Sequence, residues 1–226
     1  MNPIEKCPIC NGNDFYFRKV LSQDLINDWQ ISKDEVDYIN YQQGFGCNIC
    51  KVNLRGLTLA SSIINYFNFN KMNEFINLCE KSVLEINEAG GLTKFLNRLR
   101  NYRFAKYPEV DMQNMPYEDN TFDVLVHSDT LEHVPYSKKA LEECYRVLKV
   151  NGVLFYTIPI IHGRLSIKRF GMPKSYHGEY AKKMEDYIVY TEYGADFYLE
   201  ILEAGFKNIS LHTLGGKESI AIVACK

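Results

Sequence analysis

Apolar positions in the second half of the chain alternate between short runs and helical spacing, which predicts a strand–helix–strand unit. Residues 122–126 form an apolar run too short for a helix, and the run ends on the polar cluster 127–129. Residues 136–149 carry apolar side chains at the spacing of one buried helix face. Asn151-Gly152 is expected to end that helix before a second apolar strand, residues 153–158. This unit is a right-handed crossover, and ligands of such sheets bind at the carboxyl ends of the strands.

The same kind of pattern predicts elements on both sides of this unit. Helical spacing covers residues 21–41, 54–75 (one or two helices), 92–99 and 195–204. Apolar runs predict strands at residues 82–86 and 102–107, with a turn at 87–91 after the first of them. Residues 206–214 and 219–224 are expected to form a terminal antiparallel hairpin around Gly215-Gly216.

Two C-x-x-C pairs precede these elements and indicate a metal site. Cys7 and Cys10 form the first pair, and Cys47 and Cys50 form the second. Each pair presents two thiolates from one tight turn, so that two turns complete a tetrahedral four-sulfur site. Zinc suits such ligands, and iron could load in its place during expression. A closed all-cysteine site leaves no position for substrate, so the predicted role of the metal is structural.

Composition and charge narrow the class of protein. The chain has 226 residues, 46% hydrophobic, which suffices for one catalytic domain and a small accessory module. Neither a long apolar run nor a secretory signal pattern is present, so we expect a soluble cytoplasmic protein without membrane association. The net charge is −2, and residues 1–50 contain seven acids against four bases. Such a module is unsuited to phosphate contacts, which argues against nucleic acid as the partner.

Three motifs then follow one another in a specific order. Residues 111–123 read DMQNMPYEDNTFD, residues 131–134 read LEHV and residues 146–152 read RVLKVNG. Over about 140 residues the chain resembles a class I S-adenosylmethionine (SAM)-dependent methyltransferase of the type 11 group, and it is similar to methyltransferases of bacterial capsule or polysaccharide loci. The resemblance implies an α/β fold with a Rossmann-like seven-stranded sheet and a terminal antiparallel hairpin. We expect a zinc-binding module at residues 1–56 and the methyltransferase domain at residues 57–226.

The resemblance also implies which residues hold SAM. Glu85 would meet the methionine amino group, and the turn after it, with Asn87, Ala89 and Gly90, would line the methionine and ribose. The family favours glycine at three positions of this turn; two of them are other small residues here, and Asn tolerates a left-handed φ. Lys106 stands about where the family places the ribose-binding acid, so either Glu109 substitutes for it or the ribose is held in another way. The remaining cofactor positions are Asp111 and Met112 at the adenine, and Ser128 and Asp129 bordering the sulfonium and the acceptor.

Candidate residues for the acceptor come mostly from the segment after residue 158. A hydroxyl acceptor needs a general base, and we expect His177 or His162 to serve, with His133 as a third candidate. Residues 162–184 carry six bases against one acid. This excess predicts a positive wall for an anionic acceptor, with Arg164, Arg169 and Tyr176 as substrate-binding residues, unless the segment is a solvated surface loop.

The sequence therefore predicts a zinc-containing SAM-dependent O-methyltransferase. Its expected acceptor is a small anionic or carbohydrate molecule, such as a phosphorylated sugar, a sugar nucleotide or a glycan precursor in cell-surface polysaccharide synthesis. One alternative is an rRNA or tRNA methyltransferase, since some RNA enzymes carry an N-terminal zinc module. Another is a degenerate, non-catalytic subunit, which the altered glycine turn and Lys106 would favour. The oligomeric state does not follow from the sequence.

Overall fold

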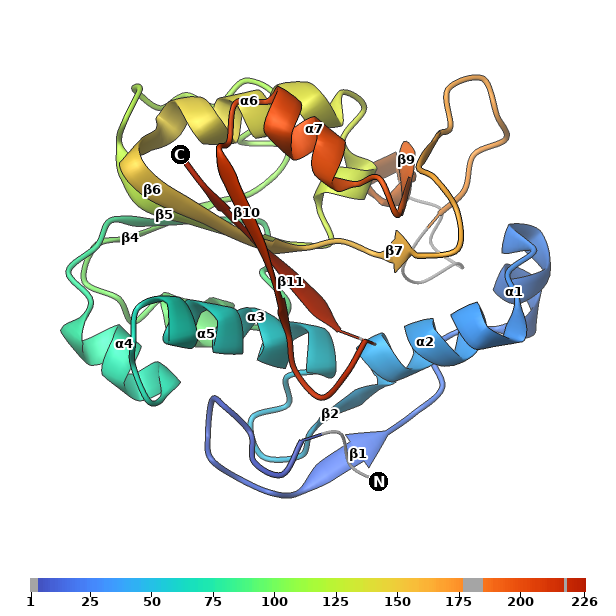
Figure 1. Ribbon diagram of the computed structural model, residues 1–226, viewed down its shortest axis with the longest axis horizontal. Helices are drawn as coiled ribbons and strands as arrows, with labels where there is room; N and C mark the ends of the chain where they lie inside the picture. Colours follow the sequence, from blue (N-terminus) through green and yellow to red (C-terminus); the bar gives the residue numbers. More distant parts are fainter. Residues whose placement is uncertain (1–3, 177–184, 218) are drawn as a thin grey trace.

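A computed structural model describes residues 4–176, 185–217 and 219–226, and it is built around one six-stranded sheet (Figure 1). The strand order is β10-β11-β6-β5-β3-β4. Strands β4, β3, β5 and β6 run parallel, whereas β11 is antiparallel to β6 and β10 is antiparallel to β11. The strands are β3 (Val83–Ile86), β4 (Tyr102–Ala105), β5 (Phe122–Ser128), β6 (Leu148–Thr157), β10 (Asn208–Thr213) and β11 (Ile220–Cys225).

Helices cover both faces of this sheet, which explains why its central strands are apolar on both sides. Figure 1 shows α6 and α7 on one face and α3, α4 and α5 on the other. Val124 and Val126 of β5 belong to the core on the α3 side, and Leu125 between them belongs to the core on the α6 side. The helices are α3 (Leu54–Tyr66), α4 (Met72–Leu78), α5 (Thr93–Leu96), α6 (Ser137–Val147) and α7 (Tyr198–Glu203), and a short 3₁₀ turn, η1, spans Leu131–His133.

The N-terminal segment forms a small sheet with two helices inserted between its strands. Strand β1 (Phe15–Phe17) pairs antiparallel with β2 (Phe45–Cys47), and α1 (Gln23–Trp29) and α2 (Lys33–Gly44) lie between them in the chain. Ser32 caps α2: its hydroxyl accepts from the Glu35 N–H, and the Glu35 carboxylate accepts from the Ser32 N–H at 2.7 Å. This cap fixes the start of α2, the helix that later forms one wall of a cavity.

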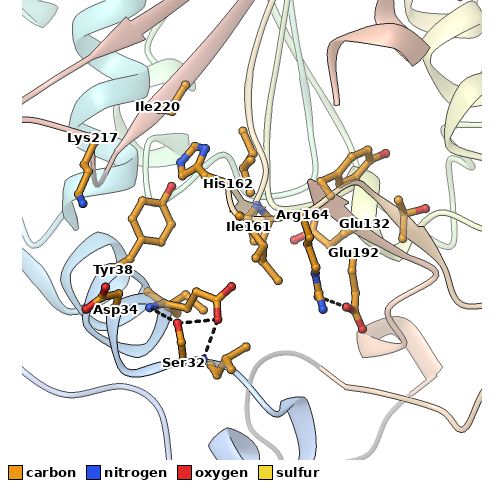
Figure 2. A pocket seen from close by; sticks show the side chains of 18 of the residues that line it. Ser32, Asp34, Tyr38, Glu132, Ile161, His162, Arg164, Glu192, Lys217 and Ile220 are labelled. Atoms are coloured by element: carbon orange, nitrogen blue, oxygen red, sulfur yellow. Dashed lines mark hydrogen bonds and ion pairs between the residues drawn. The ribbon is translucent and has the colours of Figure 1, made fainter. Parts of the chain in front are cut away.

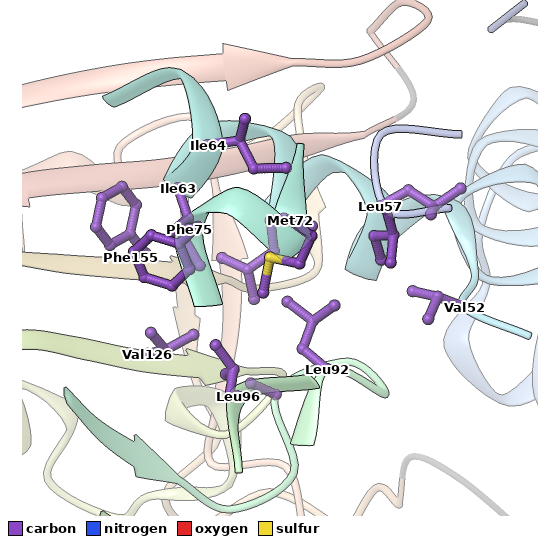
Figure 3. Packing of buried hydrophobic residues seen from close by; sticks show 14 of the residues in the cluster. Val52, Leu57, Ile63, Ile64, Met72, Phe75, Leu92, Leu96, Val126 and Phe155 are labelled. Atoms are coloured by element: carbon purple, nitrogen blue, oxygen red, sulfur yellow. The ribbon is translucent and has the colours of Figure 1, made fainter. Parts of the chain in front are cut away.

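The N-terminal segment shares a core with the rest of the chain. Cys47 and Val52 belong to the same apolar cluster as Leu57, Phe75 and Phe155 of the main fold. Figure 3 shows part of this packing, with Val52 and Leu57 at one end and Phe155 at the other. The expected domain boundary at residue 56 therefore falls inside α3, within one continuous core.

A third, three-stranded sheet extends the chain beyond β6. Its order is β7-β9-β8, with β7 (Ile160–Ile161) parallel and β8 (Ile167–Lys168) antiparallel to β9 (Thr191–Gly194). A short 3₁₀ turn, η3 (Glu185–Tyr187), precedes β9. This small sheet places the residues after Pro159 opposite α2.

Two predictions about the elements need correction. The main sheet has six strands within the described residues, because the segment before Asp111 forms a turn in which the Val110 N–H donates to Lys106 O at 2.9 Å. Pro108 in that segment has no N–H with which to join a sheet edge. In addition, β6 begins at Leu148, so the helix ends before Asn151-Gly152. Asn151, at φ 62°, instead lies where the register of β6 shifts against β5.

Candidate functional site

The strand order reverses direction between β3 and β5, and the turn that follows β3 lies at this reversal. From β3 the chain crosses to β4 on one side and returns to β5 on the other. The turn at residues 87–91 follows β3 at this point. Asn87 has φ 55°, Gly90 has φ 60° and Gly91 has φ 79°, a conformation that asparagine and glycine tolerate better than other residues. Ligands of doubly wound sheets bind at such a position.

Glu85 holds this turn in shape. Its side chain is fully buried, and its carboxylate accepts hydrogen bonds from Ala89 N at 2.8 Å, from Thr93 Oγ1 at 2.6 Å and from the Tyr102 hydroxyl at 2.6 Å. Burial raises the pKa of Glu85, and these three hydrogen bonds oppose the rise. The carboxylate therefore already has three donors, and its expected contact with the methionine amino group stays a prediction.

The start of α3, the turn after β3 and the end of β5 approach one another closely around Gly90. A Cβ on Gly56 of α3 would lie 2.1 Å from Gly90 O, and a Cβ on Gly90 would lie 3.2 Å from Ser128 Oγ. Neither glycine can therefore be replaced without displacing α3 or the turn. The start of α3, the turn after β3 and the end of β5 thus form one compact unit.

Asp129, at the end of β5, is ion-paired with a residue that the sequence reasoning missed. Its carboxylate binds the guanidinium of Arg55, the residue before Gly56. Ser128 Oγ lies 2.7 Å from Thr157 Oγ1 at the neighbouring strand end. Arg55 is the only charged residue in the segment 54–66. A single cation in an otherwise uncharged helix was the available signal.

The residues expected at the adenine and ribose lie beyond β4. The Asp111 carboxylate accepts from Gln113 N at 2.8 Å and from Gln113 Nε2 at 3.1 Å, and Met112 is buried. Lys106 and Glu109 are both exposed. The geometry brings Asp111 and Met112 into one loop, and the adenine and ribose contacts stay predictions.

A cavity of about 450 Å³ lies between α2 and the small sheet (Figure 2). His162 lines it, with its ring edge-on to that of Tyr38 at a centroid distance of 5.3 Å. Burial, and then the charge of Lys217, lowers the pKa of His162. Its walls are largely apolar, with isoleucines contributed by both sides: Ile31, Ile39, Ile160, Ile161 and Ile220.

The other two histidine candidates differ in position. His133 Nδ1 lies 3.0 Å from Ile188 O, and its Nε2 lies 3.7 Å from Glu132 Oε1. His177 is outside the described residues. Of the three, His162 is the one that the structure places on the cavity wall.

Three bases in the described part of the basic segment, residues 162–176, are ion-paired with acids that lie later in the chain. Arg164 and Arg169 both bind the carboxylate of Glu192, and Lys168 binds that of Glu200. These acids lie outside residues 162–184, so the charge count of that segment omitted them. Tyr176 forms an isolated antiparallel bridge with Ile188.

Acids outnumber bases around the cavity. Glu132, next to the expected His133, lines it and is only 1% exposed, and burial raises the pKa of its carboxyl. The sequence reasoning singled out its neighbour and missed Glu132, although both lie in the LEHV motif. The other charged lining residues are Asp34, Glu35, Glu192, Arg164 and Lys217.

The four expected metal ligands converge. Their sulfur atoms all lie within 4.8 Å of one another, with Cys7 Sγ 3.6 Å from Cys50 Sγ and Cys10 Sγ 3.6 Å from Cys47 Sγ. A tetrahedral zinc with Zn–S bonds of about 2.3 Å requires sulfur separations of roughly 3.8 Å, so the site fits zinc. Asn11 and Lys51, each directly after the second cysteine of a pair, have φ 61° and φ 57°, so the two loops share one conformation.

Within the part of the chain that the structure describes, no helix is both long and apolar enough to cross a membrane.

Comparison with known proteins places a methyltransferase domain in the chain. Residues 72–156 match the family model described as a methyltransferase domain. A Mycobacterium ulcerans phthiotriol/phenolphthiotriol dimycocerosates methyltransferase 1 is 34% identical over 74 residues, 33% of this chain and 27% of that protein. The ubiquinone/menaquinone biosynthesis C-methyltransferase UbiE of Citrobacter koseri is 42% identical over 60 residues, 25% of this chain and 24% of its own length. The chain thus spans about a quarter of each of these relatives.

Among solved structures, a Thermotoga maritima SAM-dependent methyltransferase, titled a possible histamine N-methyltransferase, aligns with a TM-score of 0.45. The alignment has 16% identity and covers 91% of this chain and all of that one. The matched domain and the curated relatives together support a SAM-dependent methyltransferase.

Proposed function

We propose that the protein is a SAM-dependent methyltransferase that methylates a small acceptor bound between α2 and the small sheet. The observation that carries this proposal is the left-handed turn 87–91, which lies at the reversal of strand order inside the matched methyltransferase domain. Glu85 holds the turn, and Asp111, Met112, Ser128 and Asp129 follow the next strands. The acceptor cavity adjoins the ends of these strands through Glu132 and Pro159.

The proposed acceptor has an apolar body and carries a hydroxyl group. Isoleucines from both walls line the cavity, and acids outnumber the bases Arg164 and Lys217 there. One relative is named as a C-methyltransferase of ubiquinone/menaquinone biosynthesis and the other as a methyltransferase of phthiotriol/phenolphthiotriol dimycocerosates, so these names bear on the body of the acceptor and do not support oxygen as the methylated atom. His162 would accept the hydroxyl proton as the oxygen attacks the methyl carbon of SAM, because its lowered pKa keeps the ring neutral near pH 7.

An anionic carbohydrate in cell-surface polysaccharide synthesis is the second candidate. Arg164 and Lys217 line the cavity and could bind a phosphate. The ion pairs of Arg164 and Arg169 with Glu192 weaken this candidate, because an incoming phosphate would have to compete with a carboxylate already in place.

Calorimetric titration with SAM and with S-adenosylhomocysteine tests the cofactor. We expect micromolar binding that falls at least tenfold in Asp111→Ala and is unchanged in Asp24→Ala, an exposed acid of α1. No binding by the folded wild-type protein would favour a non-catalytic subunit instead.

Transfer of a labelled methyl group from SAM to catechol and to glucose 1-phosphate then compares the two acceptor classes. Methylation of catechol alone supports the apolar hydroxyl acceptor. Methylation of glucose 1-phosphate alone would replace it with the anionic carbohydrate.

A further inference from the structure

Arg55 occupies the position where α3, the turn after β3 and the end of β5 converge. Gly56, its neighbour in the chain, approaches Gly90 so closely that a Cβ there would lie 2.1 Å from Gly90 O. The guanidinium of Arg55 binds the carboxylate of Asp129, at the end of β5, through Nη1. Asp129 follows Ser128, whose hydroxyl lies near Gly90. Arg55 thus lies next to the turn on which we propose that SAM binds.

The hydrogen-bonding capacity of Arg55 is only partly used. Its Nε is buried, and within residues 4–176, 185–217 and 219–226 it has no hydrogen-bond partner. The side chains of Arg55 and Asp129 remain 15% and 17% exposed through atoms other than the buried Nε, and a ligand would reach the pair there. Burial lowers the pKa of Arg55 to about 10, which still leaves the guanidinium charged at neutral pH. Asp129 already supplies one anion and Glu132 adds a second negative charge nearby, so an incoming carboxylate would share the guanidinium with Asp129.

The amino-acid end of SAM is a zwitterion, with a carboxylate and an ammonium group on one carbon atom. Glu85, the expected partner of the ammonium group, already accepts three hydrogen bonds that hold the turn. Arg55 and Asp129 offer the complementary charges side by side, a cation for the carboxylate and an anion for the ammonium.

We propose that Arg55 binds the carboxylate of the methionine part of SAM, with Asp129 holding Arg55 in place and facing the ammonium group. This inference rests on the proposed function, because it assumes that SAM binds at the turn. It assigns the amino-acid end of the cofactor to the ion pair and leaves Glu85 a structural role in the turn.

Two ligands that differ in the amino-acid end test this assignment. S-adenosylhomocysteine carries the carboxylate and the ammonium, and 5′-methylthioadenosine lacks both. In Arg55→Met we expect the dissociation constant of S-adenosylhomocysteine to rise at least tenfold, the usual cost of losing a charged hydrogen bond, and that of 5′-methylthioadenosine to stay within about twofold. Arg55→Lys, which keeps the charge but not the planar fork, should lie between the wild type and Arg55→Met.

Arg100→Met is the matched control, because Arg100 is exposed and lies away from the junction. Equal weakening of both ligands in Arg55→Met would show that Arg55 only supports the fold, and unchanged binding of S-adenosylhomocysteine would also overturn the inference. If Arg55→Met does not fold, Arg55→Lys decides by the same ratio of the two dissociation constants. Failure of the wild-type protein to bind either ligand would overturn the proposed function itself.

Discussion

His127 lies in the middle of the main sheet, with its imidazole fully buried. The ring stacks on Tyr156 at a centroid distance of 4.7 Å. Among the described residues neither ring nitrogen has a hydrogen-bond partner. Burial alone lowers the pKa of His127 to about 3, so the native protein holds this ring neutral.

This histidine should make the folded protein sensitive to acid. In the unfolded chain His127 is protonated below pH about 6.5. In the native state it is protonated only below pH about 3. The contribution of His127 to the free energy of unfolding is therefore fully present above pH about 6.5. It should fall by about 1.4 kcal/mol for each pH unit between pH about 6.5 and pH about 3. Urea unfolding at pH 7 and pH 5 measures the loss. His127→Phe should lose less stability over that interval than the wild type; an identical loss in both would assign the sensitivity to other groups.

His162 is the second histidine with a lowered pKa that leads to a prediction, and its proposed role is in catalysis. Its pKa is lowered by burial and by Lys217, so the ring stays neutral at pH 7 and can accept a proton. We expect His162→Gln to lower the methyl-transfer rate by about 10²- to 10⁴-fold and to leave the affinity for S-adenosylhomocysteine unchanged. Measured from pH 5 to pH 8, the wild-type rate should decline only below the ordinary histidine pKa. A variant with the wild-type rate would exclude His162 as the base.

The turn after β3 illustrates how one element depends on a few hydrogen bonds. Thr93→Val removes the hydroxyl that donates to the Glu85 carboxylate at 2.6 Å and keeps the shape of the side chain. We expect a loss of about 1.5–3 kcal/mol in unfolding free energy and weaker binding of S-adenosylhomocysteine, because the turn loosens. Thr121→Val is the control, since its hydroxyl donates to a carbonyl in an exposed loop. Equal losses in the two variants would contradict a special role for the Glu85 network.

Elements that follow local periodicity were predictable from the sequence. Strands β3 and β5 and helix α6 lie where the apolar spacing placed them, and the crossover between β5 and β6 is parallel as expected. The described residues form six strands, one fewer than the resemblance implies, and the segment around Pro108 forms a turn. Periodicity within a segment decides its type, whereas pairing at a sheet edge depends on the groups that the segment offers.

The sequence predicted the parts of the candidate site that lie in a recognisable motif, and it did not predict the long-range ion pairs. The four cysteines converge as their spacing predicted. The pair between Arg55 and Asp129 joins residues 74 positions apart, and Glu192 of β9 binds two arginines that flank β8. Such pairs exist only once distant elements pack together, so a count of charges along one segment cannot reveal them.

At the scale of the whole molecule, the segment that carries the four clustered cysteines and the main fold are parts of one core. Cys47, Cys50 and Val52 share an apolar cluster with Leu57 of α3 and with Phe155 of β6. Lys94 of α5 also donates to Cys50 O at 2.5 Å. The same segment carries α2, one wall of the acceptor cavity. If the four cysteines hold a metal, we expect it to affect both the stability of the sheet and the shape of the cavity.

This coupling predicts a single unfolding transition that depends on zinc. We expect the purified protein to hold about one zinc ion, and Cys47→Ser to lose it and to melt about 10 °C lower or more, because a structural zinc contributes several kcal/mol to folding. Cys225→Ser, outside the cluster, should keep the metal. Calorimetry decides between one cooperative unit and two. If Cys47→Ser retained an unchanged main transition, the chain would consist of two independent domains divided near residue 56. A lowered single transition, with weakened methyl transfer to the acceptor, would show that the metal supports the cavity through the shared core.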